Sequence, residues 1–308
     1  MKGVAGFSAR LIMSKIAVMT DSDSGITQAA GNELGITVIP MPFYINEKMF
    51  KEDIDMTQME FFDVLNPETD VKTSQPLPGD VIDAWDKALD EDGYEEIVHV
   101  PMSAYLSGGY QTAMGLAEEE KYAGRVHVVN SQRVSITQRQ MCLDARLLAE
   151  KGFSGKRIKE ILEEVRLNQS IYLAVDTLKF LKKGGRVTAA GAAIGTVLNI
   201  KPVLQIMGEK IDAYSKNRGW KAAKKSMFKA MDFDMSKEGK FGGRPVHLCF
   251  AHSCPDDAFA REWKETLEAH YGQPVHMDRL SLNVVCHTGP GAISLAASEA
   301  LDIDSYTK

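Results

Sequence analysis

Three short stretches of the chain carry the residue types that hold anions. They are residues 73–76 (TSQP), 103–111 (SAYLSGGYQ) and 287–292 (HTGPGA). Each is rich in hydroxyls or glycines, whose side chains and exposed backbone N–H groups can hold a carboxylate or a phosphate. None of them supplies a carboxylate or a cysteine that would serve as a base or nucleophile. The residue types therefore indicate a site that holds an anion, without an obvious means of reacting with it.

Other interpretations of these stretches remain open. The 103–111 segment could be a strand-to-helix loop without a ligand. A serine hydrolase or acyltransferase would use Ser103 or Ser107 with His287, but the chain lacks the G-x-S-x-G turn of that class. A phosphate-handling enzyme would use the glycines after Ser107, which match neither G-x-x-x-x-G-K-[ST] nor G-x-G-x-x-G. The hydrolase is the main alternative function.

Length and composition restrict the class of protein. A chain of 308 residues suggests two domains, which we place at 14–168 and 169–308. The net charge of −6 argues against a sequence-independent nucleic-acid binder. Apolar runs are too short for an integral membrane segment. The four cysteines form no CxxC pair, which is typical of reduced thiols in a cytoplasmic protein.

The histidines give no sign of a metal site. His247 and His252 are five residues apart on an expected strand, so one of them should face away from the other. His99 lies in another expected strand and is interpreted as a core or edge histidine. We therefore expect no metal and no cofactor.

Strands alternate with helices through the first part of the chain, and this alternation places the SGG turn between a strand and a helix. Apolar strands are expected at 15–21, 36–39, 97–100 and 125–129, and helices at 26–34, 57–65, 79–90 and 156–166. A long helix is expected to begin at Asn130-Ser131. The acidic turn 20–24 (TDSDS) predicts a helix cap, or a ligand role. Such alternation is typical of an α/β domain with a mostly parallel, Rossmann-like sheet.

The second part predicts an α/β domain with a mixed sheet. A strand at 199–206 should turn at Gly208 into a hairpin partner at 210–214. Residues 171–175 are apolar, and strands at 246–251 and 275–280 accompany helices at 218–231 and 256–271. The chain is expected to close with the HTGPGA loop and a small-residue helix. The apolar residues of 189–204 suit either a tunnel for an apolar tail or close helix packing.

Taken in order, these motifs resemble the DegV family of bacterial fatty-acid-binding proteins over residues 16–301. The matching segments are IAVMTDSDSGIT at 16–27, TSQP, SAYLSGGYQTA at 103–113, DTLKFLKKGGRVT at 176–188, LNIKPVL at 198–204 and HTGPGA. Each segment alone is weakly specific, but all of them in order and at family-like spacing make a specific signal.

The resemblance implies two α/β domains that enclose one long-chain fatty acid. Its carboxylate would lie at the domain interface and its tail in an apolar tunnel. The family's better-understood members present the acid to a separate fatty acid kinase, which makes an acyl phosphate for phospholipid synthesis. The chain itself would then have no catalytic activity.

Carried over by position, the resemblance implies that Thr73 and Ser103 or Ser107 hold the carboxylate. The other ligand-binding residues it implies are Ser74, Gly108, His287 near the head group, and Arg186 near the site or the partner-facing surface. Arg218 in SKNR would lie near the site or face the kinase. Many members read SSGLSGTY where this chain has Ala104 and Tyr105 in SAYLSGGY. Either serine of this loop is therefore a candidate ligand.

Overall fold

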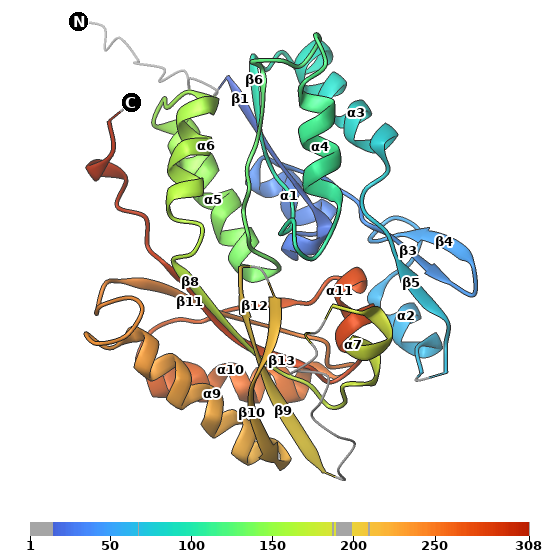
Figure 1. The fold of residues 1–308 in the computed structure, drawn as a ribbon, viewed down its shortest axis with the longest axis vertical. Helices are drawn as coiled ribbons and strands as arrows, with labels where there is room; N and C mark the ends of the chain where they lie inside the picture. Colours follow the sequence, from blue (N-terminus) through green and yellow to red (C-terminus); the bar gives the residue numbers. More distant parts are fainter. Residues whose placement is uncertain (1–14, 67, 187, 189–198, 209, 308) are drawn as a thin grey trace, which may run out of the picture.

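The first sheet is parallel, with the strand order β2-β1-β6-β7 (Figure 1). The structure is a computed structural model that describes residues 15–66, 68–186, 188, 199–208 and 210–307. The strands are β1 (Ile16–Asp21), β2 (Ile36–Ile39), β6 (Glu96–Val100) and β7 (Val126–Val128). Each lies within two residues of its expected range, and the parallel sheet confirms the α/β class.

Helices cover both faces of this sheet (Figure 1). They are α3 (Pro78–Asp86) and α4 (Gly109–Ala117) on one face, and α5 (Ile136–Glu150) and α6 (Gly155–Glu164) on the other. Successive side chains of β1 alternate between the two cores, so that Val18 packs with α5 and α6 while Met19 packs with α3. The strand is buried throughout and apolar from Ile16 to Met19, as expected for one covered on both faces.

The second sheet has six strands in the order β10-β9-β8-β13-β11-β12. They are β8 (Gln169–Ala174), β9 (Ile200–Met207), β10 (Lys210–Arg218), β11 (Val246–His252), β12 (His276–Arg279) and β13 (Ile293–Glu299). Because β11 and β12 pair in parallel and the other neighbours are antiparallel, the sheet is mixed, as predicted. Helices α9 (Gly219–Met235) and α10 (Asp257–Tyr271) cover one face, and the other faces the first half of the chain (Figure 1).

A small antiparallel sheet joins the two halves, and the sequence analysis did not predict it. Its strands are β3 (Pro42–Ile45), β4 (Lys48–Lys51) and β5 (Val71–Thr73), and the helices near it are α2 (Gln58–Val64), α7 (Lys179–Gly184) and α11 (Leu282–Thr288). Phe43 and Phe61 share one core with Leu173 and Leu204 of the second sheet. The remaining short elements are α1 (Gln28–Leu34), η1 (Ser22–Ser24), η2 (Lys87–Glu91) and η3 (Ile303–Ser305).

Two predictions about helices were wrong. The long helix begins at Ile136 rather than at residue 130, because the preceding segment is held extended: Ser131 Oγ donates to Pro101 O at 2.6 Å, and Ser103 N donates to Arg133 O at 2.8 Å.

The chain does not close with a small-residue helix after the HTGPGA loop. Residues 293–299 instead form β13, paired on both sides with β8 and β11, so sheet pairing overrides the helix propensity of the alanines.

The division at residue 168 stays a prediction. The second sheet begins with β8 at Gln169, while Leu301, Ile303 and Tyr306 pack on the core of the first sheet. Residues 189–198, which include most of the segment interpreted as tunnel or close packing, lie outside the described residues. None of the helices among the described residues is long and apolar enough to cross a membrane.

Candidate functional site

A cavity of about 340 Å³ lies between the second sheet and the first half of the chain. This interface cavity falls within the range of roughly 300–1,000 Å³ that is usual for small-molecule sites. Most of its wall is apolar and comes from Met41, Met102, Leu106, Val134, Ile136, Ile171, Leu173, Leu181, Ile206, Ile211, Leu280 and Val284. Such a wall suits an apolar ligand several carbons long, because burial of each methylene contributes about 0.8 kcal/mol.

Much of the polar lining comes from the three stretches that the sequence singled out, and Ser135, Arg186, Asn283 and Ser294 supply the rest. Of the predicted site residues, those that line the cavity are Thr73, Ser74, Ser107, Gly108, Arg186 and His287. Thr73 ends β5, Ser107 and Gly108 precede α4, and His287 lies in the last turn of α11. The fold thus brings together residues that are up to 214 positions apart in the sequence.

Two predicted residues do not line the cavity. Ser103 is 1% exposed, and its hydroxyl donates to the Gly208 carbonyl oxygen at 2.8 Å. This bond fastens the loop to the end of β9, which is a structural role. Arg218 is exposed at the end of β10, where the chain enters α9.

Thr73 and His287 form the polar centre of the cavity. Thr73 Oγ1 lies 2.9 Å from His287 Nε2, and burial together with the nearby Arg186 guanidinium lowers the pKa of His287 to about 4. The ring is therefore neutral at physiological pH. Nδ1 is buried and has no hydrogen-bond partner among the described residues. Because unpaired buried N–H groups are rarer than unpaired acceptors, we assign the proton to Nε2, which donates to Thr73 Oγ1.

Close approaches explain why these stretches contain glycine. A Cβ at Gly108 would lie 2.4 Å from Gln75 Oε1, and the amide of Gln75 donates to Thr112 Oγ1 at 2.8 Å. The TSQP segment therefore packs directly on the start of α4. At Gly289 φ is +74°, and a Cβ there would lie 2.4 Å from Phe180 Cδ2 on α7. Glycine is required at Gly289 by its positive φ and by the Phe180 ring, whereas a side chain at Gly108 would displace the flexible end of Gln75.

Buried carboxylates hold the loops of the site, and the sequence analysis did not assign this role to them. Asp21 Oδ2 accepts from Met102 N at 2.7 Å, next to the Ser103–Ser107 loop. Asp23 Oδ1 accepts from the Ser281 hydroxyl, and Glu52 Oε1 accepts from Leu282 N, both at 2.5 Å. The last two contacts fix the start of α11, which carries His287.

Burial raises the pKa of each of these carboxyl groups. The pKa of Asp21 is raised to about 6 and that of Glu52 to about 7, and that of Asp23 is raised by burial and by the neighbouring Asp21 charge. The acidic turn TDSDS thus neither caps α1, a role filled by Thr27, nor lines the interface cavity. The acidic residues of that turn are visible in the sequence, but the sequence does not indicate that Asp23 pairs with Ser281 or that Glu52 pairs with Leu282.

The geometry offers no activated nucleophile at this site among the described residues. His287 Nε2 is paired with Thr73, and Nδ1 has no carboxylate to orient the ring as a catalytic triad requires. Burial raises the pKa of the Cys286 thiol beyond its usual range, so it is not a thiolate at neutral pH. No group of three or more potential metal ligands occurs within the described ranges.

Fold and site together define an α/β protein with two large sheets, a small third sheet and an internal apolar cavity, whose polar lining consists of hydroxyls, amides, an imidazole and a guanidinium. The chain belongs to the DegV family, because the family profile described as "Uncharacterised protein, DegV family" matches residues 15–300. A DegV domain-containing protein of Deinococcus radiodurans is 29% identical over 282 residues, covering 91% of this chain and 97% of that protein. One from Staphylococcus aureus is 33% identical over 211 residues, or 68% of this chain and 73% of that protein.

Solved structures of the family share the whole fold. A fatty-acid-binding DegV family protein from Thermus thermophilus superposes with a TM-score of 0.81 at 30% identity, covering 92% of this chain and 99% of that one. DegV from Bacillus subtilis, described as a fatty acid binding protein, gives 0.79 at 26% identity with the same coverage. A stearic acid-binding protein from Eubacterium ventriosum has the same fold, with a TM-score of 0.83 at 20% identity, over 94% of this chain and 100% of that one.

Proposed function

We propose that this protein binds one long-chain fatty acid in the interface cavity. The observation that carries the proposal is the composition of the wall. Its side chains are mainly aliphatic, and the hydroxyls of Thr73, Ser74 and Ser107 lie among them with the hydrogen-bonded Thr73–His287 pair. The tail would lie along the side chains that include Ile171, Leu173 and Ile206. The fatty-acid-binding relatives from Thermus thermophilus and Bacillus subtilis support this ligand class.

The carboxylate would be held by hydroxyls and by a nearby arginine. With His287 Nε2 donating to Thr73 Oγ1, the Thr73 hydroxyl hydrogen is available to the ligand. Ser107 Oγ accepts from Gly109 N at 3.2 Å, so its hydrogen is likewise available. Arg186 supplies a positive charge at the cavity and is exposed, which suits a head group that must be reached from outside.

We further propose that the chain is a carrier and not an enzyme by itself. A neutral His287 without an orienting group, paired with a threonine, lacks the arrangement that activates a serine. The fatty acid would instead be presented to a fatty acid kinase, with Arg218 on the surface that faces it. The four cysteines are unpaired and buried, which supports a reducing, cytoplasmic location.

Reconstitution with a fatty acid kinase tests the partner. Arg218→Ala should lower kinase-dependent formation of acyl phosphate more than it lowers oleate binding, because Arg218 lies outside the cavity lining. Arg261→Ala, which removes an exposed arginine on α10, is the matched control. An equal loss in both assays would make Arg218 a ligand or stability residue. Ester hydrolysis that depends on His287 would favour the hydrolase instead.

A further inference from the structure

The interface cavity also holds a hydrogen-bond acceptor for which the described part of the chain supplies no donor. Asn283 of α11 is 3% exposed and lines the cavity. Its Nδ2 donates to Pro42 O at 3.3 Å and to Ser74 O at 3.4 Å. Because both partners are carbonyl oxygens, the NH₂ side of the amide must face them, and this fixes the orientation of the group. No donor among the described residues reaches the other end of the amide, Oδ1. A buried acceptor in this situation indicates that a ligand atom or a water completes it.

A plain fatty acid does not supply this donor. An ionised carboxylate only accepts hydrogen bonds, and its tail carries no polar hydrogen. Two further hydroxyls of the lining are used within the fold: Ser294 Oγ accepts from Ala251 N at 2.8 Å and donates to Ala251 O at 3.0 Å, and Thr288 Oγ1 donates to Gly289 O at 3.3 Å. A carboxylate held by Thr73 and Ser107 therefore leaves Asn283 Oδ1 without a donor from the ligand.

The acceptor lies close to the expected place of the head group. Asn283 and His287 are four residues apart on α11, so their side chains share one face, with about 5–6 Å between their β-carbons. The same spacing appears opposite them, where Thr73 contacts His287 and the next residue, Ser74, contacts Asn283. The lining continues beyond Asn283 to Leu280. A tail that follows α11 from the head group toward Leu280 passes the amide within its first few carbons.

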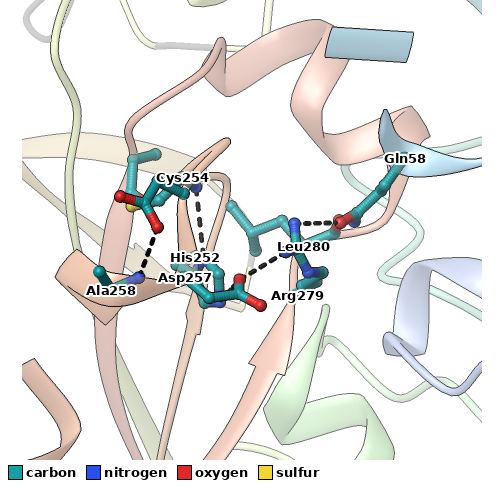
Figure 2. Close-up of polar contacts among 9 residues, drawn as sticks. Gln58, His252, Cys254, Asp257, Ala258, Arg279 and Leu280 are labelled. Atoms are coloured by element: carbon teal, nitrogen blue, oxygen red, sulfur yellow. Dashed lines mark hydrogen bonds and ion pairs between the residues drawn. The ribbon is translucent and has the colours of Figure 1, made fainter. Parts of the chain in front are cut away.

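The segment that leads into α11 is held from outside the cavity. Gln58 Nε2 donates to Leu280 O at 2.6 Å, and Gln58 Oε1 accepts from the Arg279 guanidinium at 2.9 Å (Figure 2). These bonds add to the buried-carboxylate contacts that fix the start of α11. Asn283 is thus a preorganised acceptor, and such a group discriminates between ligands because it cannot turn to another partner.

We propose that the interface cavity is adapted to a fatty acid with a hydroxyl on carbon 3, which donates its hydrogen to Asn283 Oδ1. The inference rests on the proposed function, because it takes the carboxylate to lie at Thr73 and Ser107. Carbon 3 of such an acid is a stereocentre. Since Asn283 is held on one wall, the hydroxyl of only one enantiomer can point at Oδ1 while the carboxylate and the tail keep their places. The cavity is therefore expected to distinguish the two enantiomers.

Isothermal titration of delipidated protein with (R)- and (S)-3-hydroxymyristate tests the proposal. The two acids have identical solubility in water, so a difference in affinity arises from contacts in the cavity. One enantiomer should bind about tenfold more tightly than the other, as expected for one hydrogen bond to a buried acceptor that otherwise stays unpaired. Equal affinities would overturn the proposal and would indicate that a water completes Asn283 Oδ1.

A matched pair of variants tests the role of Asn283. Asn283→Leu replaces the amide with an apolar group of similar size, and Pro42 O keeps its bond from Ser74 N at 3.2 Å. The ratio of the two affinities should fall to within about twofold of unity. Asn32→Leu, at an exposed position of α1 outside the cavity lining, should keep the wild-type ratio. A preference that persists in Asn283→Leu would contradict the assignment. The comparison of enantiomers in the wild type stands even if this variant does not fold.

Myristate, titrated separately, distinguishes this inference from the proposed function. Binding of myristate together with equal affinities for the two hydroxy acids would overturn the inference alone. Failure of myristate and of both hydroxy acids to bind would overturn the proposed function, and the inference with it.

Discussion

Replacing Thr73 with valine removes one hydroxyl from the interface cavity while keeping the shape of the side chain. Valine suits the end of β5 as well as threonine does, because both are β-branched. The change removes the acceptor for His287 Nε2 and the hydroxyl proposed to donate to the ligand carboxylate. It leaves the aliphatic wall untouched, so loss of affinity would report on the head group alone.

The magnitude follows from the type of hydrogen bond. A hydroxyl that donates to a carboxylate contributes about 1.5–3 kcal/mol. Since about 1.4 kcal/mol corresponds to a tenfold change, oleate affinity should fall by roughly 10- to 100-fold. Isothermal titration of delipidated protein with oleate measures this directly, and the melting temperature of the ligand-free variant checks that the fold is intact.

A second threonine on an exposed strand position provides the control. Thr37→Val makes the same substitution in β2, where the side chain is exposed and lies outside the cavity lining. It should leave oleate affinity unchanged. If Thr73→Val bound oleate within about twofold of wild type, with an intact fold, the reasoning on the head group would be refuted.

Three further predictions concern the loops around the cavity. Ser107→Ala should weaken oleate binding. Ser103→Ala should instead lower the melting temperature without a comparable loss of affinity, because the Ser103 hydroxyl donates to Gly208 O. Oleate titration and thermal melts of both variants test these two outcomes. Gly184→Ala should weaken oleate binding in the same titration, since its Cβ would lie 2.0 Å from His287 Nδ1 and displace the ring. The Glu52 pKa, raised by burial from 4.5 to about 7, means that the folded state binds the extra proton, so this residue's contribution to stability is complete below pH 4.5 and is lost as pH rises to 7. In urea denaturation, the stability of wild type relative to Glu52→Gln should therefore fall over that range, and a constant difference would contradict the raised pKa.

Much of the fold could be predicted from the sequence because local pattern and tertiary context agree. The central strand β1 is apolar from Ile16 to Met19, and its residues Val18 and Met19 meet different cores, as such a run requires. At β13 the local pattern and the tertiary context disagree. Its alanines favour a helix in isolation, but pairing with β8 and β11 at the centre of a sheet imposes the strand.

The site was predictable as a set of stretches but not as a set of contacts. Thr73 and His287 lie 214 positions apart, and nothing in either stretch indicates that their side chains would meet. Ser103 and Ser107 are equivalent in sequence, and the difference between them arises from the Gly208 carbonyl, which lies in the turn after β9. The acidic turn was visible, yet its role depends on Ser281 and Leu282 at the far end of the chain.

The ligand content of the purified protein tests the central claim most directly. Protein prepared without added lipid should be denatured, extracted and examined by mass spectrometry, beside Thr73→Val and Thr37→Val prepared in the same way. We expect about one long-chain fatty acid per chain in wild type and Thr37→Val, and clearly less in Thr73→Val. Protein that carries no fatty acid and also fails to bind added oleate after delipidation would contradict the claim that the interface cavity holds a fatty acid.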